Sequence, residues 1–247
     1  MSSEQRKSWG AKINRWLPNL YYIGTLASLC FILAQAYYAK QSILQSSDWE
    51  KAKMTIDNVE KFKQELQNSP LSKGSMLSLG DKHYPDFSTK EGWEESELLR
   101  VEYWNHFEDK DEARSEFFRL LEVLDSFAYP IIMGYASESG SFSMVARLYY
   151  SYSAFIMPEA FHKMPNIGYN AKLLYRLWRI KSETLFIQAV LSSQDEEALR
   201  EVNVKNLLYY GYTDISFSKL EKYLNTLDQK TKEMQKEILS FRKKTIE

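Results

Sequence analysis

Two short patterns in the sequence place a histidine close to a carboxylate. Glu159 and His162 are three residues apart, and Glu102 and His106 are four apart. Both spacings put the two side chains on one helix face, and ferritin-like di-metal sites use a Glu-x-x-His pair in this way. Such a site needs a second Glu-x-x-His pair on another helix, and the sequence contains none. We therefore predict no metal site and interpret these residues as structural.

The remaining histidine, His83, lies in a stretch rich in Gly, Pro and Ser, beside Tyr84 and Asp86. A loop histidine can act as a general base, but no nucleophile motif accompanies this one. The sequence also lacks the glycine-rich phosphate loops, the Gly-x-Ser-x-Gly elbow and the His-Glu-x-x-His motif. We therefore assign no catalytic, cofactor-binding or metal-ligating residue and predict no cofactor. An enzyme with an unrecognised site around His83 or His162 stays an alternative.

The charge balance argues against nucleic acid as a partner. Lys and Arg number 32 against 33 Asp and Glu, whereas nucleic-acid-binding domains show a basic excess. The single cysteine, Cys30, lies in an apolar N-terminal run, so the sequence excludes a disulfide within the chain and a cysteine-based metal site.

That apolar run predicts a transmembrane helix over residues 17–39. It contains no charged residue, and about 20 helical residues cross a hydrocarbon core of about 30 Å. Tyrosine pairs near both ends match the aromatic belt at membrane surfaces, which a buried core helix would rarely carry. A cleaved signal peptide would end in small residues, but Tyr37, Tyr38 and Lys40 follow here. The lipid bilayer is thus a predicted partner.

Residues 1–16 are basic, and Trp9, Ile13 and Trp16 recur in them at helical spacing. This segment is either a cationic helix lying in the membrane interface or a disordered basic tail. Four Lys or Arg precede the span and three lysines follow it closely, so the positive-inside bias favours a cytoplasmic N-terminus by one charge. We expect a single-pass protein of the cell membrane, and the side that carries residues 40–247 stays open.

Residues 40–247 predict a soluble all-α domain, because Gly (9) and Pro (6) are scarce and hydrophobic residues make up 44% of the chain. The first expected helix covers 48–67, after a Ser-x-x-Glu capping box at its start. Residues 68–92 form the longest irregular stretch, which is either a functional, mobile loop or a disordered insertion.

Helical spacing and breakers predict the elements that follow. Pro130 is expected to kink or split its helix, and the tyrosines near 149–152 and 209–212 either form a binding surface or pack in the core. The expected elements are helices over 93–107 and from 111, a turn over 137–143 around Gly140, a helix over 142–156, a short turn of helix between Pro158 and Pro165, and helices over 170–191, 193–210 and 216–246.

The last of these helices, 216–246, carries apolar residues at alternating steps of four and three. This seam is narrow enough for a coiled coil. The helix either packs on its own domain or forms a homo-oligomer through the seam. The seam consists of Leu220, Leu224, Leu227, Thr231, Met234, Ile238 and Phe241.

Three segments carry a resemblance to a known family: AKQSILQSSDWEKAK after the span, FFRLLEVLDSFAYPIIMGYASESGSFSMVARLYYSY, and KLLYRLW. The chain resembles a bacterial family of single-span, membrane-anchored, all-helical proteins of unknown function. The resemblance implies a helix pair around a short turn in 117–178 and no catalytic residues. The chain departs from the family in 68–92 and lacks a basic cluster right after the span. In family members, such a cluster would keep the domain in the cytoplasm.

These features together predict a membrane-tethered helical interaction or scaffold module without catalytic activity, with an unidentified protein partner. One alternative is a membrane-associated effector or sensor in bacterial stress or anti-phage defence. A pocket of converging ionisable groups would favour the enzyme alternative, and a solid aromatic core would favour the interaction module.

Overall fold

The chain divides into two compact units, residues 1–50 and 51–247. The computed structural model describes residues 35, 37–42, 45–80, 85–193 and 217–246. In the first unit, residues 37–42 and 45–50 are helical and exposed. No helix among the described residues has the length and apolar character needed to span a bilayer. The predicted membrane helix lies outside the described residues except at 35 and 37–39.

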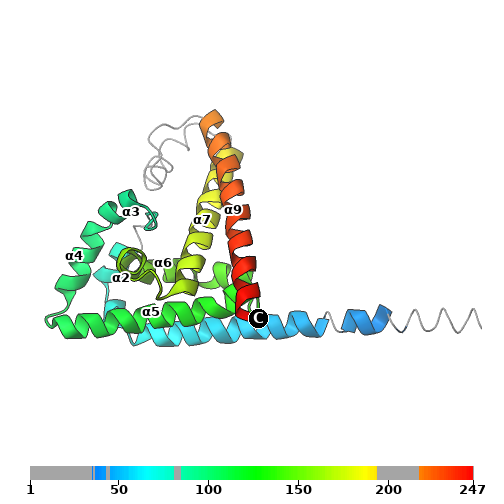
Figure 1. Cartoon of the computed structure of the whole chain (residues 1–247), viewed down its shortest axis with the longest axis horizontal. Coiled ribbons are helices and arrows are strands. Elements are labelled where there is room, and N and C mark those ends of the chain that lie inside the picture. Colours follow the sequence, from blue (N-terminus) through cyan, green and yellow to red (C-terminus); the bar gives the residue numbers. More distant parts are fainter. Residues whose placement is uncertain (1–34, 36, 43–44, 81–84, 194–216, 247) are drawn as a thin grey trace, which may run out of the picture. The chain divides into compact units, whose positions relative to one another are not determined.

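The described part of the second unit is mostly helical and has no strands, which confirms the all-α prediction (Figure 1). The 51–67 helix lies along α5, and α7 lies beside α9. The elements are the 51–67 helix, η1 (Pro70–Ser72), α2 (Ser75–Gly80), α3 (Lys90–Glu95), α4 (Glu97–His106), α5 (Lys110–Met133), α6 (Glu138–Lys163), α7 (Tyr169–Ser193) and α9 (Phe217–Ile246).

Aromatic rings from four helices form the centre of the core. Phe62 stacks on Phe127 at 4.1 Å between ring centroids, and Tyr149 meets Trp178 edge-on at 5.1 Å. The Tyr149 hydroxyl donates to the carbonyl oxygen of Ala171 (2.8 Å), so its polar end is satisfied where the ring is buried. The tyrosines at 149, 150 and 152 are all buried, which favours core packing over a binding surface for this run.

Prolines interrupt the helices less than expected. α5 continues past Pro130 to Met133, and Gly134 ends it at a φ of 87°. α6 runs through Pro158 to Lys163, so the predicted separate turn between the two prolines is wrong. A proline inside a helix removes one hydrogen bond, but all ten residues of 151–160 are buried, and this packing holds the helix together.

α6 begins at Glu138, earlier than the start at residue 142 that was expected after a turn around Gly140. Ser137 is its N-cap, and the Ser137 hydroxyl accepts from the backbone N–H of Gly140 (3.1 Å). The predicted turn over 137–143 is therefore wrong, because the glycine falls in the first helical turn. A Cβ at Gly140 would lie 3.3 Å from the methyl group of Thr55, so the glycine permits the close approach of the 51–67 helix.

The stretch 68–92 is more regular than predicted. It contains η1 and α2, because Leu71 and Met76 are apolar anchors that reach the core. The hydroxyl of Thr89 accepts from the N–H of Gly92 and caps α3. The predicted helix over 93–107 is two helices, α3 and α4, which adjoin at Ser96.

α9 packs mainly against α7, with its seam turned toward the core. Leu220, Leu227, Met234 and Ile238 are buried, and the rest of the seam is partly buried. The Arg242 guanidinium donates to the carbonyl oxygens of Ile131 and Ile132 at the end of α5. The seam is thus covered within one copy of the chain, which favours the intramolecular alternative. The expected helix over 193–210 lies outside the described residues, apart from Ser193 at the end of α7.

Candidate functional site

The structure gives the Glu159–His162 pair structural roles. Glu159 is buried and forms an ion pair with Lys163 (2.7 Å). Nε2 of His162 lies 3.1 Å from the carbonyl oxygen of Phe87, and its ring packs on Trp93 at 4.6 Å. Each side chain therefore has its own partner, and the two do not converge on a common ligand.

The other candidate residues are dispersed. Glu102 and His106 are both exposed on α4, while His83 and Cys30 lie outside the described residues. Across the described residues, no group of three or more His, Cys, Asp or Glu side chains could hold a metal ion.

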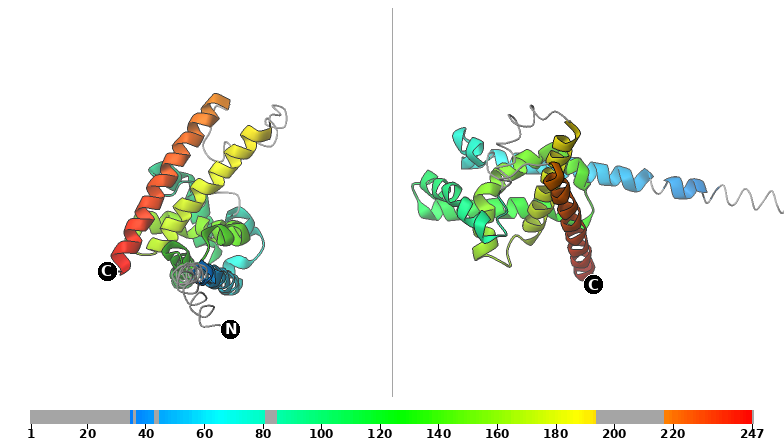
Figure 2. Two further views of the ribbon diagram at one scale, coloured as in Figure 1. Left: turned by 90° about the vertical axis from the view of Figure 1, so that its right-hand side faces the viewer. Right: turned by 90° about the horizontal axis from the view of Figure 1, so that it is seen from above.

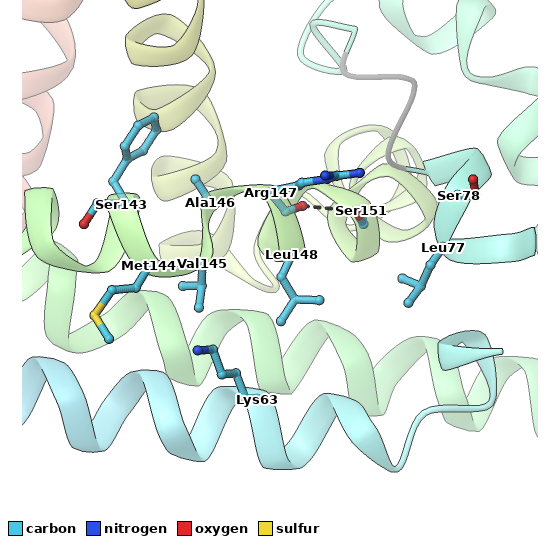
Figure 3. A pocket seen from close by; sticks show the side chains of 11 residues that line it. Lys63, Leu77, Ser78, Ser143, Met144, Val145, Ala146, Arg147, Leu148 and Ser151 are labelled. Atoms are coloured by element: carbon cyan, nitrogen blue, oxygen red, sulfur yellow. Dashed lines mark hydrogen bonds between the residues drawn. The ribbon is translucent and has the colours of Figure 1, made fainter. Parts of the chain in front are cut away.

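A groove of 660 Å³ lies on the outer side of α6, between the 51–67 helix and α2 (Figure 3). Figure 3 shows Lys63 below the α6 side chains and Leu77 to one side of them. Met144 is 47% exposed, and Leu148 is half-buried. The lining residues are Lys63, Leu77, Ser78, Phe142, Ser143, Met144, Val145, Ala146, Arg147, Leu148 and Ser151.

Two polar contacts fix the 51–67 wall of the groove. The hydroxyl of Thr55 accepts from the backbone N–H of Ser137 (2.7 Å), so the start of α6 is fixed one turn of helix before the groove. The side-chain amide of Asn58 donates to the carbonyl oxygen of Phe127 (2.9 Å). The 51–67 helix is thereby attached to both α5 and α6.

The α2 wall depends on one glycine. A Cβ at Gly80 would lie 2.4 Å from the carbonyl oxygen of Ser151 and 2.6 Å from the ring of Phe155. Only glycine lets α2 approach α6 this closely. Leu77 and Ser78, one turn earlier, are held at the groove by this contact.

The groove carries charge of one sign. Its ionisable lining residues are Lys63 and Arg147, and no carboxylate lines it. Apolar side chains with two cations suit a ligand that has an apolar surface and acidic groups. Its only hydroxyl groups are on serines, and no histidine or carboxylate lies among the lining residues to activate one.

A second hollow, of 300 Å³, lies between α7, α9 and the segment at 86–88, and its charges are balanced. Arg176 pairs with Glu237 (3.2 Å). Arg179 contacts both Asp86 (3.6 Å) and Glu183 (3.3 Å). These ion pairs join α9 and the 86–88 segment to α7, and they involve four of the six ionisable residues that line the hollow.

The buried carboxylate of Glu116 lies at the C-terminal end of the 51–67 helix. Glu116 on α5 accepts from the hydroxyl of Ser69 (2.6 Å) and from two nitrogens of Arg119 (2.7 and 2.8 Å). Arg119 also donates to the carbonyl oxygen of Glu65 (3.2 Å). The hydrogen bond with Glu116 raises the pKa of Arg119. Burial, together with the nearby Glu116 charge, raises the pKa of Tyr152 to about 12.

No protein-family model matches this chain, and no curated protein and no solved structure shows significant similarity to it. The resemblance to a membrane-anchored bacterial family therefore stays an expectation.

Sequence reasoning missed both hollows. Ser143, Arg147 and Ser151 recur every four residues and mark the groove side of α6. Apolar residues surround that stripe on both sides, so it could not be separated from the core-facing residues. The charges of the second hollow come from positions as distant as Asp86 and Glu237, and no local pattern connects them.

Proposed function

We propose that the chain is a membrane-tethered helical interaction module without catalytic activity. Its groove over α6 receives an amphipathic helix of a partner protein whose polar side carries Asp or Glu. The groove itself is the observation that supports this proposal. It joins the exposed Met144 to two cations, Lys63 and Arg147, with no carboxylate in its lining.

An amphipathic helix fits this groove better than a compact ligand does. The groove follows α6 over residues 142–151, and helical partners bind such grooves through apolar residues at i, i+3, i+4 and i+7. Met144 offers a flexible, polarisable contact that adapts to different apolar side chains. Charges at a groove's rim accelerate association and select partners of opposite charge.

Two observations rank the alternatives below this proposal. An enzyme needs reactive groups that are available to a substrate, but most of the ionisable groups that line the hollow between α7 and α9 pair with one another. An effector or sensor in bacterial stress or anti-phage defence needs an element that moves. The groove walls are fixed by the Thr55–Ser137 hydrogen bond and by the close approach at Gly80.

The tether in this proposal is the predicted span over 17–39. Expressed in bacteria, the full chain should sediment with membranes and resist extraction by high salt or carbonate. A fragment beginning at Ser46 should be soluble. Recovery of the full chain in the soluble fraction without detergent would contradict the tether and leave the groove to be tested separately.

A pair of synthetic peptides tests the groove. Both form the same amphipathic helix with leucines on the apolar side, and the polar side carries Glu in one and Lys in the other. We expect the full chain in lipid nanodiscs to bind the Glu peptide at least tenfold more tightly at low salt, with the preference lost at high salt.

Charge reversal locates that binding. Lys63→Glu together with Arg147→Glu should invert the peptide preference, whereas Lys110→Glu on the exposed start of α5 should leave it unchanged. Equal binding of both peptides to the unmodified chain would exclude an acidic helix as the partner.

A further inference from the structure

Three segments that are distant in sequence meet at one end of the second unit. Ser137 donates its N–H to the hydroxyl of Thr55, and a Cβ at Gly134 would lie 3.1 Å from the guanidinium of Arg242. The α5–α6 connection is therefore next to the 51–67 helix at Thr55 and next to α9 at Arg242. Figure 1 shows the C-terminal end of α9 near this end of α5, and Figure 2 shows the last turn of α9 extending to one side of it.

This end is basic and exposed. Lys51, Lys53, Lys243 and Lys244 are all exposed, and within the described part of the chain none of them forms an ion pair. Glu138, the nearest carboxylate on α6, is already paired with Lys181 (2.9 Å). We call these four lysines the basic end.

An exposed aromatic ring accompanies the lysines. Tyr135, in the α5–α6 connection, is 52% exposed, and Met54 in the first turns of the 51–67 helix is 46% exposed. Tyrosine beside lysine is a common pairing where proteins meet lipid headgroups, because the ring enters the interface and the ammonium groups meet phosphates.

The chain reaches the predicted span from this same end. Lys51 is the first residue of the second unit, and residues 40–50 are all that separate it from the predicted span. Even fully extended, this connection measures at most about 40 Å. The basic end is thus held near the bilayer, which raises its effective concentration at the headgroups.

We propose that the basic end binds anionic phospholipid headgroups of the leaflet from which the chain's own span emerges. This inference rests on the proposed tether. Anionic lipids lie mainly in the cytoplasmic leaflet, so residues 51–247 face the cytoplasm. Lys243 and Lys244 then supply from the end of the chain the basic cluster that the sequence lacks after the span, and they outweigh the one-charge bias toward the opposite topology.

The experiment places a fluorophore on Thr245→Cys in a Cys30→Ser chain. The full chain is reconstituted in nanodiscs of phosphatidylcholine alone or mixed with phosphatidylglycerol, each with a headgroup spin-labelled lipid as quencher. Each lysine near an anionic surface contributes about fivefold in affinity. We expect stronger quenching with phosphatidylglycerol, and we expect Lys243→Glu with Lys244→Glu, or high salt, to abolish the difference.

The control is a charge reversal of equal size away from this end, Lys110→Glu with Lys222→Glu, which should keep the difference. Equal quenching in the two lipid compositions would overturn the inference. It would also be overturned if the control variant lost the difference in quenching to the same extent as the variant with Lys243→Glu and Lys244→Glu. A chain that stays soluble and enters no nanodisc refutes the tether alone. Flotation of that soluble chain with phosphatidylglycerol vesicles, compared with phosphatidylcholine, then decides whether the basic end binds lipid.

Discussion

The two hollows of the second unit differ in how their charges are used. Between α7 and α9, cations and carboxylates alternate and pair across elements that are distant in sequence. Along α6, the groove combines apolar side chains with cations only. Paired charges stabilise contacts between helices, whereas a lining of one sign attracts a partner of the opposite charge. The ion pairs between α7 and α9 hold helices together, and the groove along α6 is the proposed binding surface.

The largest expected effect on stability comes from the seam of α9, whose Met234 lines the hollow between α7 and α9. Leu227→Lys together with Met234→Lys would bury two charges in the core and cost several kcal/mol of stability. Thermal unfolding should show a collapse of Tm with no change in subunit number. Thr226→Lys with Gln235→Lys, at exposed positions of α9, is the control. An oligomer that dissociates into stable monomers would show instead that the seam joins two copies.

The extent of this seam was predictable from sequence, because a heptad pattern repeats over many residues. The expected range of 216–246 agrees with α9 within one residue at its start. The path of α6 through Pro158 was not predictable, because the local rule for proline ignores the burial of all ten residues in 151–160. The groove was equally hidden, since its walls come from three elements that only the tertiary fold brings together.

A smaller effect distinguishes buried from exposed charge pairs. Arg119→Met leaves the buried Glu116 with one fewer partner and should cost about 2 kcal/mol, reduced from the value for fully buried pairs because Arg119 is a third exposed. Arg176→Met breaks a pair in which both side chains are more than one-third exposed and should cost less than about 1 kcal/mol. Urea unfolding measures the loss of stability in both variants. A larger loss for Arg176→Met than for Arg119→Met would contradict the conclusion that the buried Glu116–Arg119 pair stabilises the fold more.

Alkaline pH should weaken the core by a comparable amount. Burial raises the pKa of Tyr149, and it raises the pKa of Tyr152 to about 12. The contribution of these two tyrosines to the free energy of unfolding is therefore complete below about pH 10 and is lost as the pH rises toward 12. Burial lowers the pKa of Lys172. The effect of Lys172 therefore makes the free energy of unfolding rise with pH, and this rise ends near pH 10.4, the pKa of lysine in an unfolded chain. Urea midpoints should therefore fall above about pH 10.4, and Tyr152→Phe should reduce the fall.

We expect the groove, and not the hollow between α7 and α9, to receive the partner. Titration of the Glu peptide into the full chain, with Tm recorded for each variant, tests it most directly. Met144→Glu at the exposed groove position puts a repelling carboxylate in the groove, so it should leave Tm unchanged and reduce affinity at least tenfold, while Arg176→Met should bind like the unmodified chain. Undiminished binding by Met144→Glu, or loss of binding in Arg176→Met at unchanged Tm, would contradict the claim.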